Sequence, residues 1–250
     1  MQANHLPIEH DPLLVGASFV IAIFASYAAL VIIERLRQGS KHPAWLWMGA
    51  STYGMGVWAM HFTAMTALRL ESLVAAYDPL LTLLSVVWAI LGAAAAFHLV
   101  RTPRVGPLQV LGAGFFLGTG IGAMHYTGML AMRLEARLSF DPLLAVLSVL
   151  VAVVLGAFGM WTLTSALFSR FRFRYLLTTT LTGLAIPFMH YTAMLAARFT
   201  PVEQSHSMAA VHGLFSLNLF ILLAVTLTAL PLFASAMLEA AAERGPEVET

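Results

Sequence analysis

The sequence predicts an all-α integral membrane protein in which seven transmembrane helices form three tandem two-helix repeats plus a seventh helix. Two observations on composition indicate the membrane: 60% of the residues are hydrophobic and only 10% are charged, whereas a soluble domain carries about 25% charged residues. A third observation indicates the repeat, because one six-residue motif occurs three times at a nearly constant interval. A fixed period of this size is typical of an internally repeated architecture.

Long apolar runs separate the few charged clusters, and several of them reach the roughly 20 residues that span a bilayer. We predict helices over residues 12–33, 44–68, 79–100, 107–132, 142–168, 175–197 and 208–236. Each two-helix repeat opens with Asp-Pro-Leu-Leu, at Asp11, Asp78 and Asp141. Aspartate can cap a helix and proline is favoured at its first position, so these residues should begin the first helix of each pair. The seventh helix has no partner.

The connections between helices predict the orientation. Those on one side of the membrane, together with the C-terminal tail, hold nine lysines and arginines, and those on the other side hold four. Because positive loops stay in the cytoplasm, the N-terminus is predicted outside and the C-terminus inside. The predicted domains are an extracytoplasmic N-terminus (1–11), a membrane domain (12–238) and a short cytoplasmic tail (239–250).

Composition also excludes several classes of function. The chain has no cysteine, which rules out disulfides and thiolate metal sites. The net charge is +1 and no basic run is dense, so no nucleic-acid partner is expected. Membrane lipid is the partner that the apolar runs imply.

The repeated motif places a histidine and a methionine four residues apart, on one face of a helix. Its three copies are Met60-His61-Phe62-Thr63-Ala64-Met65, Met124-His125-Tyr126-Thr127-Gly128-Met129 and Met189-His190-Tyr191-Thr192-Ala193-Met194. A glycine precedes each histidine by seven residues (Gly54, Gly118 and Gly183), and an arginine follows it by eight (Arg69, Arg133 and Arg198). We expect the glycines to hold the motif helices close to one another and the arginines to anchor the helices at the membrane interface.

Two helices per repeat give all three copies the same orientation, so the repeats are expected to surround an axis along the membrane normal. If the three pairs close around that axis, the three histidines lie at one depth and face a common centre. Counting eight residues back from the arginines places them roughly 12 Å inside the outer helix ends.

Ionisable groups at membrane depth are functional by default, and the ligand types here indicate a metal. Imidazole suits copper, zinc and iron, whereas thioether selects Cu(I). Copper therefore fits best; zinc would leave the methionines without a role, and haem would need an axial histidine or a His/Met pair. The predicted ligands are His61, His125 and His190 with Met65, Met129 and Met194, and the secondary candidates are Met60, Met124 and Met189.

The three registered motifs closely resemble the MHYT domain of bacterial membrane sensors, over roughly residues 10–238. This resemblance implies a location in the bacterial cytoplasmic membrane and copper bound by the motif histidines and methionines. It further implies sensing of a diatomic gas such as oxygen, carbon monoxide or nitric oxide, and coupling to a cytoplasmic signalling output domain or partner protein. Phe62 departs from the motif tyrosine, so a phenol is not required in the first copy.

We therefore predict a membrane sensory module that binds copper near the outer face, senses a gas or the copper redox state, and performs no catalysis itself. The residues leave open a membrane copper carrier or metallochaperone, and a haem-binding electron-transfer protein. A copper oxidase-type enzyme lacks a visible acid-base partner at the site. No output domain follows the seventh helix, so the chain is expected to be part of a longer protein or to act through a partner.

Overall fold

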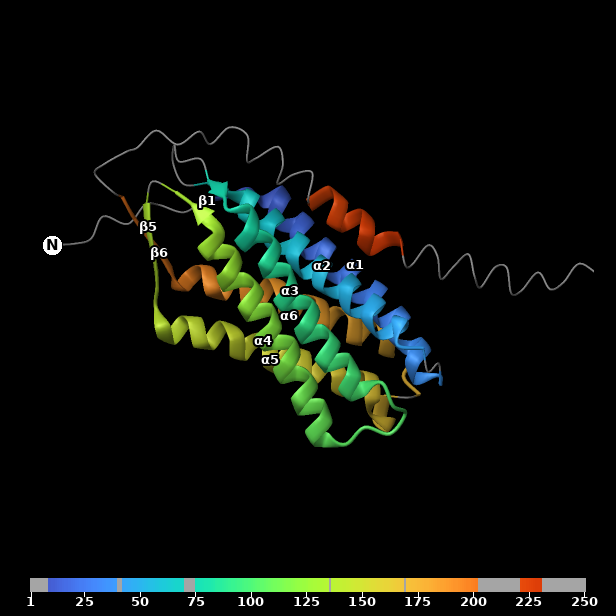
Figure 1. The fold of residues 1–250 in the computed structure, drawn as a ribbon. Helices are drawn as coiled ribbons and strands as arrows, with labels where there is room; N and C mark the ends of the chain where they lie inside the picture. Colours follow the sequence, from blue (N-terminus) through green and yellow to red (C-terminus); the bar gives the residue numbers. More distant parts are fainter. Residues whose placement is uncertain are drawn as a thin grey trace, which may run out of the picture.

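The structure is a computed structural model that describes residues 9–39, 42–69, 75–134, 136–168, 170–201 and 221–230. Its long helices run side by side in one bundle (Figure 1). They are α1 (Pro12–Arg37), α2 (Ala44–Ala67), α3 (Pro79–Val100), α4 (Pro107–Ala131), α5 (Pro142–Thr164) and α6 (Arg174–Ala196), with a short 3-10 helix η1 (Ala166–Phe168) after α5. The all-α fold class is thereby confirmed, and six of the predicted ranges match these helices within four residues. Of the seventh predicted range, the described part is the helix Ile221–Leu230, and the rest of that range lies outside the described residues, as do residues 1–8 of the predicted N-terminus and the whole predicted tail, 239–250.

Aspartate caps begin the first helix of each pair, as predicted. The Asp11 carboxylate accepts a hydrogen bond from the Leu13 amide at 3.0 Å, and the Asp78 carboxylate accepts one from the Leu81 amide at 3.0 Å. In the third repeat, Asp141 caps α5 in the same way. Proline follows each aspartate at the first helical position, where its fixed φ suits the helix and its missing N–H leaves no donor unpaired.

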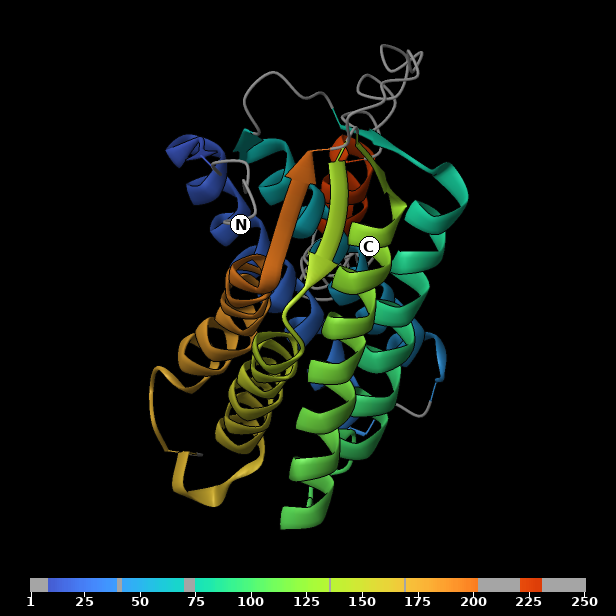
Figure 2. The ribbon, with the colours of Figure 1, turned by 90° about the vertical axis from the view of Figure 1, so that its left-hand side faces the viewer.

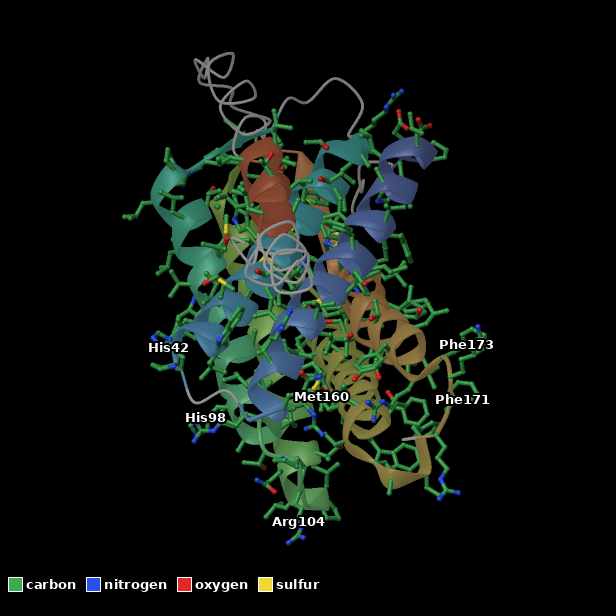
Figure 3. The ribbon with its side chains drawn as sticks, turned by 90° about the vertical axis from the view of Figure 1, so that its right-hand side faces the viewer. His42, His98, Arg104, Met160, Phe171 and Phe173 are labelled. Atoms are coloured by element: carbon green, nitrogen blue, oxygen red, sulfur yellow. The ribbon has the colours of Figure 1, made fainter. Side chains whose placement is uncertain are left out.

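Short antiparallel strand pairs, which the sequence does not predict, close each repeat at one end of the bundle. They pair β1 (Glu9–His10) with β2 (Leu68–Arg69), β3 (Ala76–Tyr77) with β4 (Met132–Arg133), and β5 (Ala136–Phe140) with β6 (Ala197–Pro201). Figure 2 shows β5 and β6 side by side above their helices. We call this the strand end of the bundle. The opposite, basic end carries the arginine-containing connections, with His98 and Arg104 labelled there in Figure 3.

The three repeated arginines reach back to the capping aspartates of their own repeats. Arg133 lies 3.0 Å from the Asp78 carboxylate, and the equivalent pairs are Arg69 with Asp11 at 2.8 Å and Arg198 with Asp141 at 3.1 Å. The Leu81 amide and then the Arg133 guanidinium hold the pKa of the Asp78 carboxyl below its ordinary value. Exposed pairs of this kind stabilise a fold only weakly, so their main consequence is to fix how the two helices of a repeat meet.

The six long helices form a closed ring of pseudo-threefold symmetry. The motif helices α2, α4 and α6 contact one another at the centre, and each outer helix packs against two of them. Thus α3 lies against α2 and α4, α5 lies against α4 and α6, and α1 lies against α2 and α6. The contact between α1 and α6 joins the first repeat to the third, which confirms the predicted closure.

We call the contacts between a motif helix and the outer helix of the next repeat the seams of the ring. The repeated glycines lie at these seams, so the prediction that they bring two motif helices together was wrong. A Cβ on Gly54 would lie 2.7 Å from the Ile90 amide nitrogen of α3, and a Cβ on Gly183 would lie 2.8 Å from the Ile23 Cα of α1. Gly118 stands equally close to Val153 of α5. Each glycine therefore admits the outer helix of the next repeat around the ring, and does not bring two motif helices together.

The inner and outer helices differ in burial as this ring requires. In α2, 16 of 24 residues are buried, whereas in α5 only 7 of 23 are buried. Outward-facing leucines, valines and aromatics cover α3 and α5, and such a continuous apolar surface suits lipid. Among the described helices, α1, α3, α4 and α5 are long and apolar enough to cross a membrane by length and composition. The faces of α2, α4 and α6 that meet at the centre are covered by protein, so they can carry the glycine, threonine and histidine that lipid would disfavour.

The glycine seam gives a stability prediction. Gly118→Ala should lower the free energy of unfolding by about 2 kcal/mol, because the new methyl group collides with the backbone of α5 and overpacking of this kind costs about 1–3 kcal/mol. Thermal unfolding of the purified protein, followed by circular dichroism, measures the effect. Gly16→Ala in α1 is the control, since no atom lies within 4 Å of its added Cβ; equal melting temperatures for the two variants would contradict the seam.

Candidate metal centre

Three motif histidines lie at one level of the bundle axis. His61, His125 and His190 each stand six residues before the last residue of α2, α4 and α6, about 9 Å from the helix end at 1.5 Å per residue. All three imidazoles are at most 1% exposed. The identical register in three helices around one axis brings them to the same depth.

The imidazoles meet through their Nδ1 atoms in a nearly equilateral triangle. The Nδ1 atom of His61 lies 3.1 Å from that of His190 and 3.3 Å from that of His125, and the remaining side measures 3.2 Å. The three rings stand roughly edge to face, at interplanar angles of 73–83°. The three nitrogens therefore converge on one central point.

Hydrogen bonding between the rings cannot satisfy this triangle. A neutral imidazole carries at Nδ1 either one hydrogen or one lone pair. If one ring donates its Nδ1 hydrogen, the other two still direct lone pairs at each other at just over 3 Å. Charging further rings would bury positive charge without a carboxylate partner, which is costly. A shared cation at the centre removes the repulsion among all three lone pairs.

The dimensions suit a metal ion. With sides averaging 3.2 Å, the centre lies 3.2/√3, about 1.8 Å, from each nitrogen, close to the roughly 2.0–2.1 Å of a zinc–imidazole bond. The three histidines are also the one metal-holding group of His, Cys, Asp and Glu side chains found among the described residues. No Asp, Glu or Cys side chain of the described residues belongs to this group, so the centre offers three imidazole nitrogens as ligands.

The outer nitrogens of the same rings have no hydrogen-bond partner within the described structure: the Nε2 atoms of His61, His125 and His190 are buried and unpaired. The His61 ring leans on Gly128 of α4, where an added Cβ would lie 2.6 Å from its Nε2 atom. Glycine in the second copy of the motif, where the others have alanine, therefore leaves room for this ring. Packing, and not hydrogen bonds at Nε2, orients the imidazoles.

The six motif methionines fall into two groups. Met65, Met129 and Met194, one turn beyond the histidines toward the strand end, belong to a small buried cluster with Met132, Ala197 and Phe199. Met60, Met124 and Met189 instead belong to the main hydrophobic core. The first group thus forms a layer of thioethers next to the histidine triangle, on its strand-end side. The second group packs among apolar side chains.

The motif tyrosines connect neighbouring repeats. The Tyr126 hydroxyl lies 2.9 Å from the Ser148 hydroxyl of α5, and the Tyr191 hydroxyl lies 3.2 Å from the Ser18 hydroxyl of α1. Phe62 has no hydroxyl, and at its seam the Trp58 indole donates to the Thr82 carbonyl at 3.0 Å. The phenols therefore bridge inner to outer helices, which explains why the first copy tolerates phenylalanine.

Several residues near this site lie outside the repeated motif, so the motif does not identify them. Ser18, Ser85 and Ser148 occupy equivalent turns of the outer helices and are all buried; their equal distance from the Asp-Pro start could have indicated them. Met132 has no methionine counterpart in the other repeats, so repetition could not point to it. His98, as expected, lies at the basic end, away from the triangle (Figure 3).

The comparisons with known proteins agree with this architecture. The family described as MHYT, the bacterial signalling protein N-terminal repeat, matches residues 1–44, 54–113, 118–175 and 183–244. The chain is 37% identical over 191 residues to the cyclic di-GMP phosphodiesterase NbdA of Pseudomonas aeruginosa, covering 75% of this chain and 24% of NbdA. It is 38% identical over 203 residues to the bifunctional diguanylate cyclase/cyclic di-GMP phosphodiesterase MucR of the same organism, covering 76% of this chain and 28% of MucR.

A more distant relative is the signaling protein YkoW of Bacillus subtilis, which is 27% identical over 199 residues, 77% of this chain and 24% of YkoW. The chain spans about a quarter of the length of these curated relatives, and no solved structure matches it. The fold and the site define a repeated-helix membrane module of bacterial signalling proteins. The chain belongs to the MHYT family.

The bridging tyrosines give a test that separates structure from metal binding. Tyr126→Phe should lower the free energy of unfolding by about 1 kcal/mol through the lost hydrogen bond to Ser148, and should leave the metal content unchanged. Thermal unfolding and elemental analysis of the purified variant measure both quantities. Tyr27→Phe on the exposed surface of α1, where the ring is 48% exposed, is the matched control; loss of metal from Tyr126→Phe would contradict the bridging role.

Proposed function

We propose that this chain is a membrane sensory module that holds one copper ion on His61, His125 and His190. The observation that carries the proposal is the convergence of three buried Nδ1 atoms at 3.1–3.3 Å. Imidazole alone suits copper, zinc, iron and nickel, and the adjacent thioether layer favours Cu(I) among them. Met65, Met129 and Met194 stand where one of them could complete the coordination. The core methionines Met60, Met124 and Met189 remain secondary ligands in this proposal.

Copper bound in this way supplies a position for a small ligand. Three protein ligands leave the metal open to a further group, and the apolar cluster on the strand-end side would admit an uncharged diatomic gas such as oxygen, carbon monoxide or nitric oxide. The protein's own part is to hold three neutral nitrogens in place and to exclude water and carboxylates from them. Gas binding or a change in the copper redox state is the proposed signal.

The seventh predicted helix offers a route for that signal. The described segment Ile221–Leu230 packs on the first repeat: Ala224 and Thr228 are buried, and a Cβ on Gly56 of α2 would lie 3.8 Å from the Thr228 side chain. Gly56 precedes His61 by five residues on the same inner helix, about 7.5 Å along it. A shift of α2 at the metal would therefore move this segment.

The remaining parts of the proposal concern the membrane and the output. By the charge of its connections, the strand end faces outward and the basic end faces the cytoplasm, with the membrane domain at 12–238 between terminal segments 1–11 and 239–250. The bacterial cytoplasmic membrane is the proposed location. The matched region is about a quarter of NbdA and MucR. The enzymatic activities in those names would lie in the other three quarters, with this module as a sensor without catalysis.

The copper content tests this proposal. Protein purified in detergent without nickel resin should contain about one copper ion per chain with no Soret band, since haem would give one. Iron with a Soret band, or no metal after incubation with Cu(I), would overturn the copper proposal. Cu(I)-loaded protein exposed to carbon monoxide should show a carbonyl stretching band in the infrared if the ion has an open position.

The ligand assignment has its own test. A variant with His61→Ala, His125→Ala and His190→Ala should lose the copper and keep its helical circular dichroism spectrum, because the ring is held by glycine seams and strand pairs away from the triangle. The matched control is His98→Ala, which removes an exposed histidine at the basic end. Full copper content in the triple variant would contradict the site.

A further inference from the structure

Met132 breaks the threefold symmetry of the ring at its strand end. It is the C-cap residue that follows the last residue of α4, and its backbone amide donates to the Met129 carbonyl. The equivalent C-cap residues of α2 and α6 are Leu68 and Ala197, whose amides donate to the Met65 and Met194 carbonyls in the same way. The three positions share one backbone geometry, and only the second repeat has a thioether there.

Met132 lies between the outside of the bundle and the buried thioether layer. It belongs to the same cluster as Met65, Met129 and Met194, and at 9% it is the most exposed of the four methionines. A cavity of about 250 Å³ opens beside it, and its lining consists of Met129, Leu130, Met132, Arg133, Leu134, Ala136 and Leu138. Among the side chains that line this cavity, Met132 and Met129 carry thioethers, which are the ligands that a soft metal prefers.

The second repeat therefore presents three ligand atoms in succession. Met132 follows Met129 by three residues and His125 by seven. The three side chains therefore form a series of ligands that extends about 10 Å along the helix, from the cavity to the histidine triangle. Met129 itself is fully buried, and it lines the cavity while belonging to the layer next to the triangle. The other two repeats have no methionine at the position equivalent to Met132.

The chemistry of the cavity selects a soft monovalent ion. Thioether sulfur binds Cu(I) and is a poor ligand for hard cations. No carboxylate lines the cavity, and its one arginine, Arg133, is paired with Asp78 at 3.0 Å. The Tyr77 hydroxyl lies 4.0 Å from the Met132 sulfur, toward which it donates a weak hydrogen bond.

We propose that Met132 and Met129 form a thioether loading site through which Cu(I) reaches the three histidines from the strand end. This inference rests on the proposed function, since it assumes that the triangle binds copper. The assignment separates two properties of the metal centre. The histidines set how tightly the ion is held, and Met132 sets how fast it arrives.

The experiment measures the rate and the equilibrium of loading with the same protein. Metal-free full-length protein in detergent is mixed with Cu(I) held by a chromogenic chelator, and the transfer is followed by stopped-flow absorbance. Met132→Leu, a swap of similar volume, should slow the transfer by about tenfold, equivalent to a barrier raised by about 1.4 kcal/mol. The final copper content at equilibrium should equal that of the wild type.

Two controls sharpen the result. Met160→Leu replaces a fully buried methionine that lies in α5, outside the thioether cluster, and this variant should load at the wild-type rate. Loading with Zn(II), which thioethers bind poorly, should be equally fast in the wild type and in Met132→Leu. A slowed rate for Zn(II) as well would indicate a general distortion and would overturn the loading site.

The outcomes distinguish the two proposals. If the wild-type protein takes up no Cu(I), the proposed function fails. If the wild type loads and Met132→Leu loads at the same rate, the loading site alone fails. As a measurement that needs no variant, Ag(I) added below one equivalent to protein with methyl-labelled methionine should shift the Met132 and Met129 methyl signals in the NMR spectrum; unmoved signals would overturn the site.

Discussion

The convergence of three neutral imidazole nitrogens on one buried point is the constraint on which the rest of this structure depends. The three Nδ1 atoms lie 3.1–3.3 Å from one another, and hydrogen bonds between the rings cannot satisfy all three of them at once. They stay together because each imidazole is packed tightly on a separate helix of the ring. The protein thus holds three potential metal ligands in place through packing, which is the general property of a preorganised metal site.

The ring provides this rigidity by repeating one set of contacts around an axis. A capping aspartate and an arginine join the two helices of each repeat, a glycine admits the outer helix of the next repeat, and at two seams a tyrosine–serine contact crosses the same boundary. Because the last seam joins α6 to α1, an error at any one seam changes the whole triangle. Three positions break the threefold repetition of the sequence: Phe62, Gly128 and Met132. All three lie in the second helix pair or in contact with it.

The sequence predicted most of this arrangement, for identifiable reasons. Helix ends followed from Asp-Pro caps, and the common depth of His61, His125 and His190 followed from their equal spacing. The partner of Gly118 was not predictable, because packed helices cross at an angle and the same face two turns away meets a different neighbour. The strands of two to five residues carry too little alternation to be recognised, and Met132 lacks the repetition that identified the other ligands.

Both the proposed sensing and the proposed loading require one ion bound by all three Nδ1 atoms. X-ray absorption at the copper edge of the loaded protein, combined with the copper-to-protein ratio, measures this most directly. We expect one ion per chain with three imidazole nitrogens at a single distance of about 2.0 Å, similar to other metal–imidazole bonds. A spectrum with one or two imidazoles per copper, or three independent ions per chain, would contradict it.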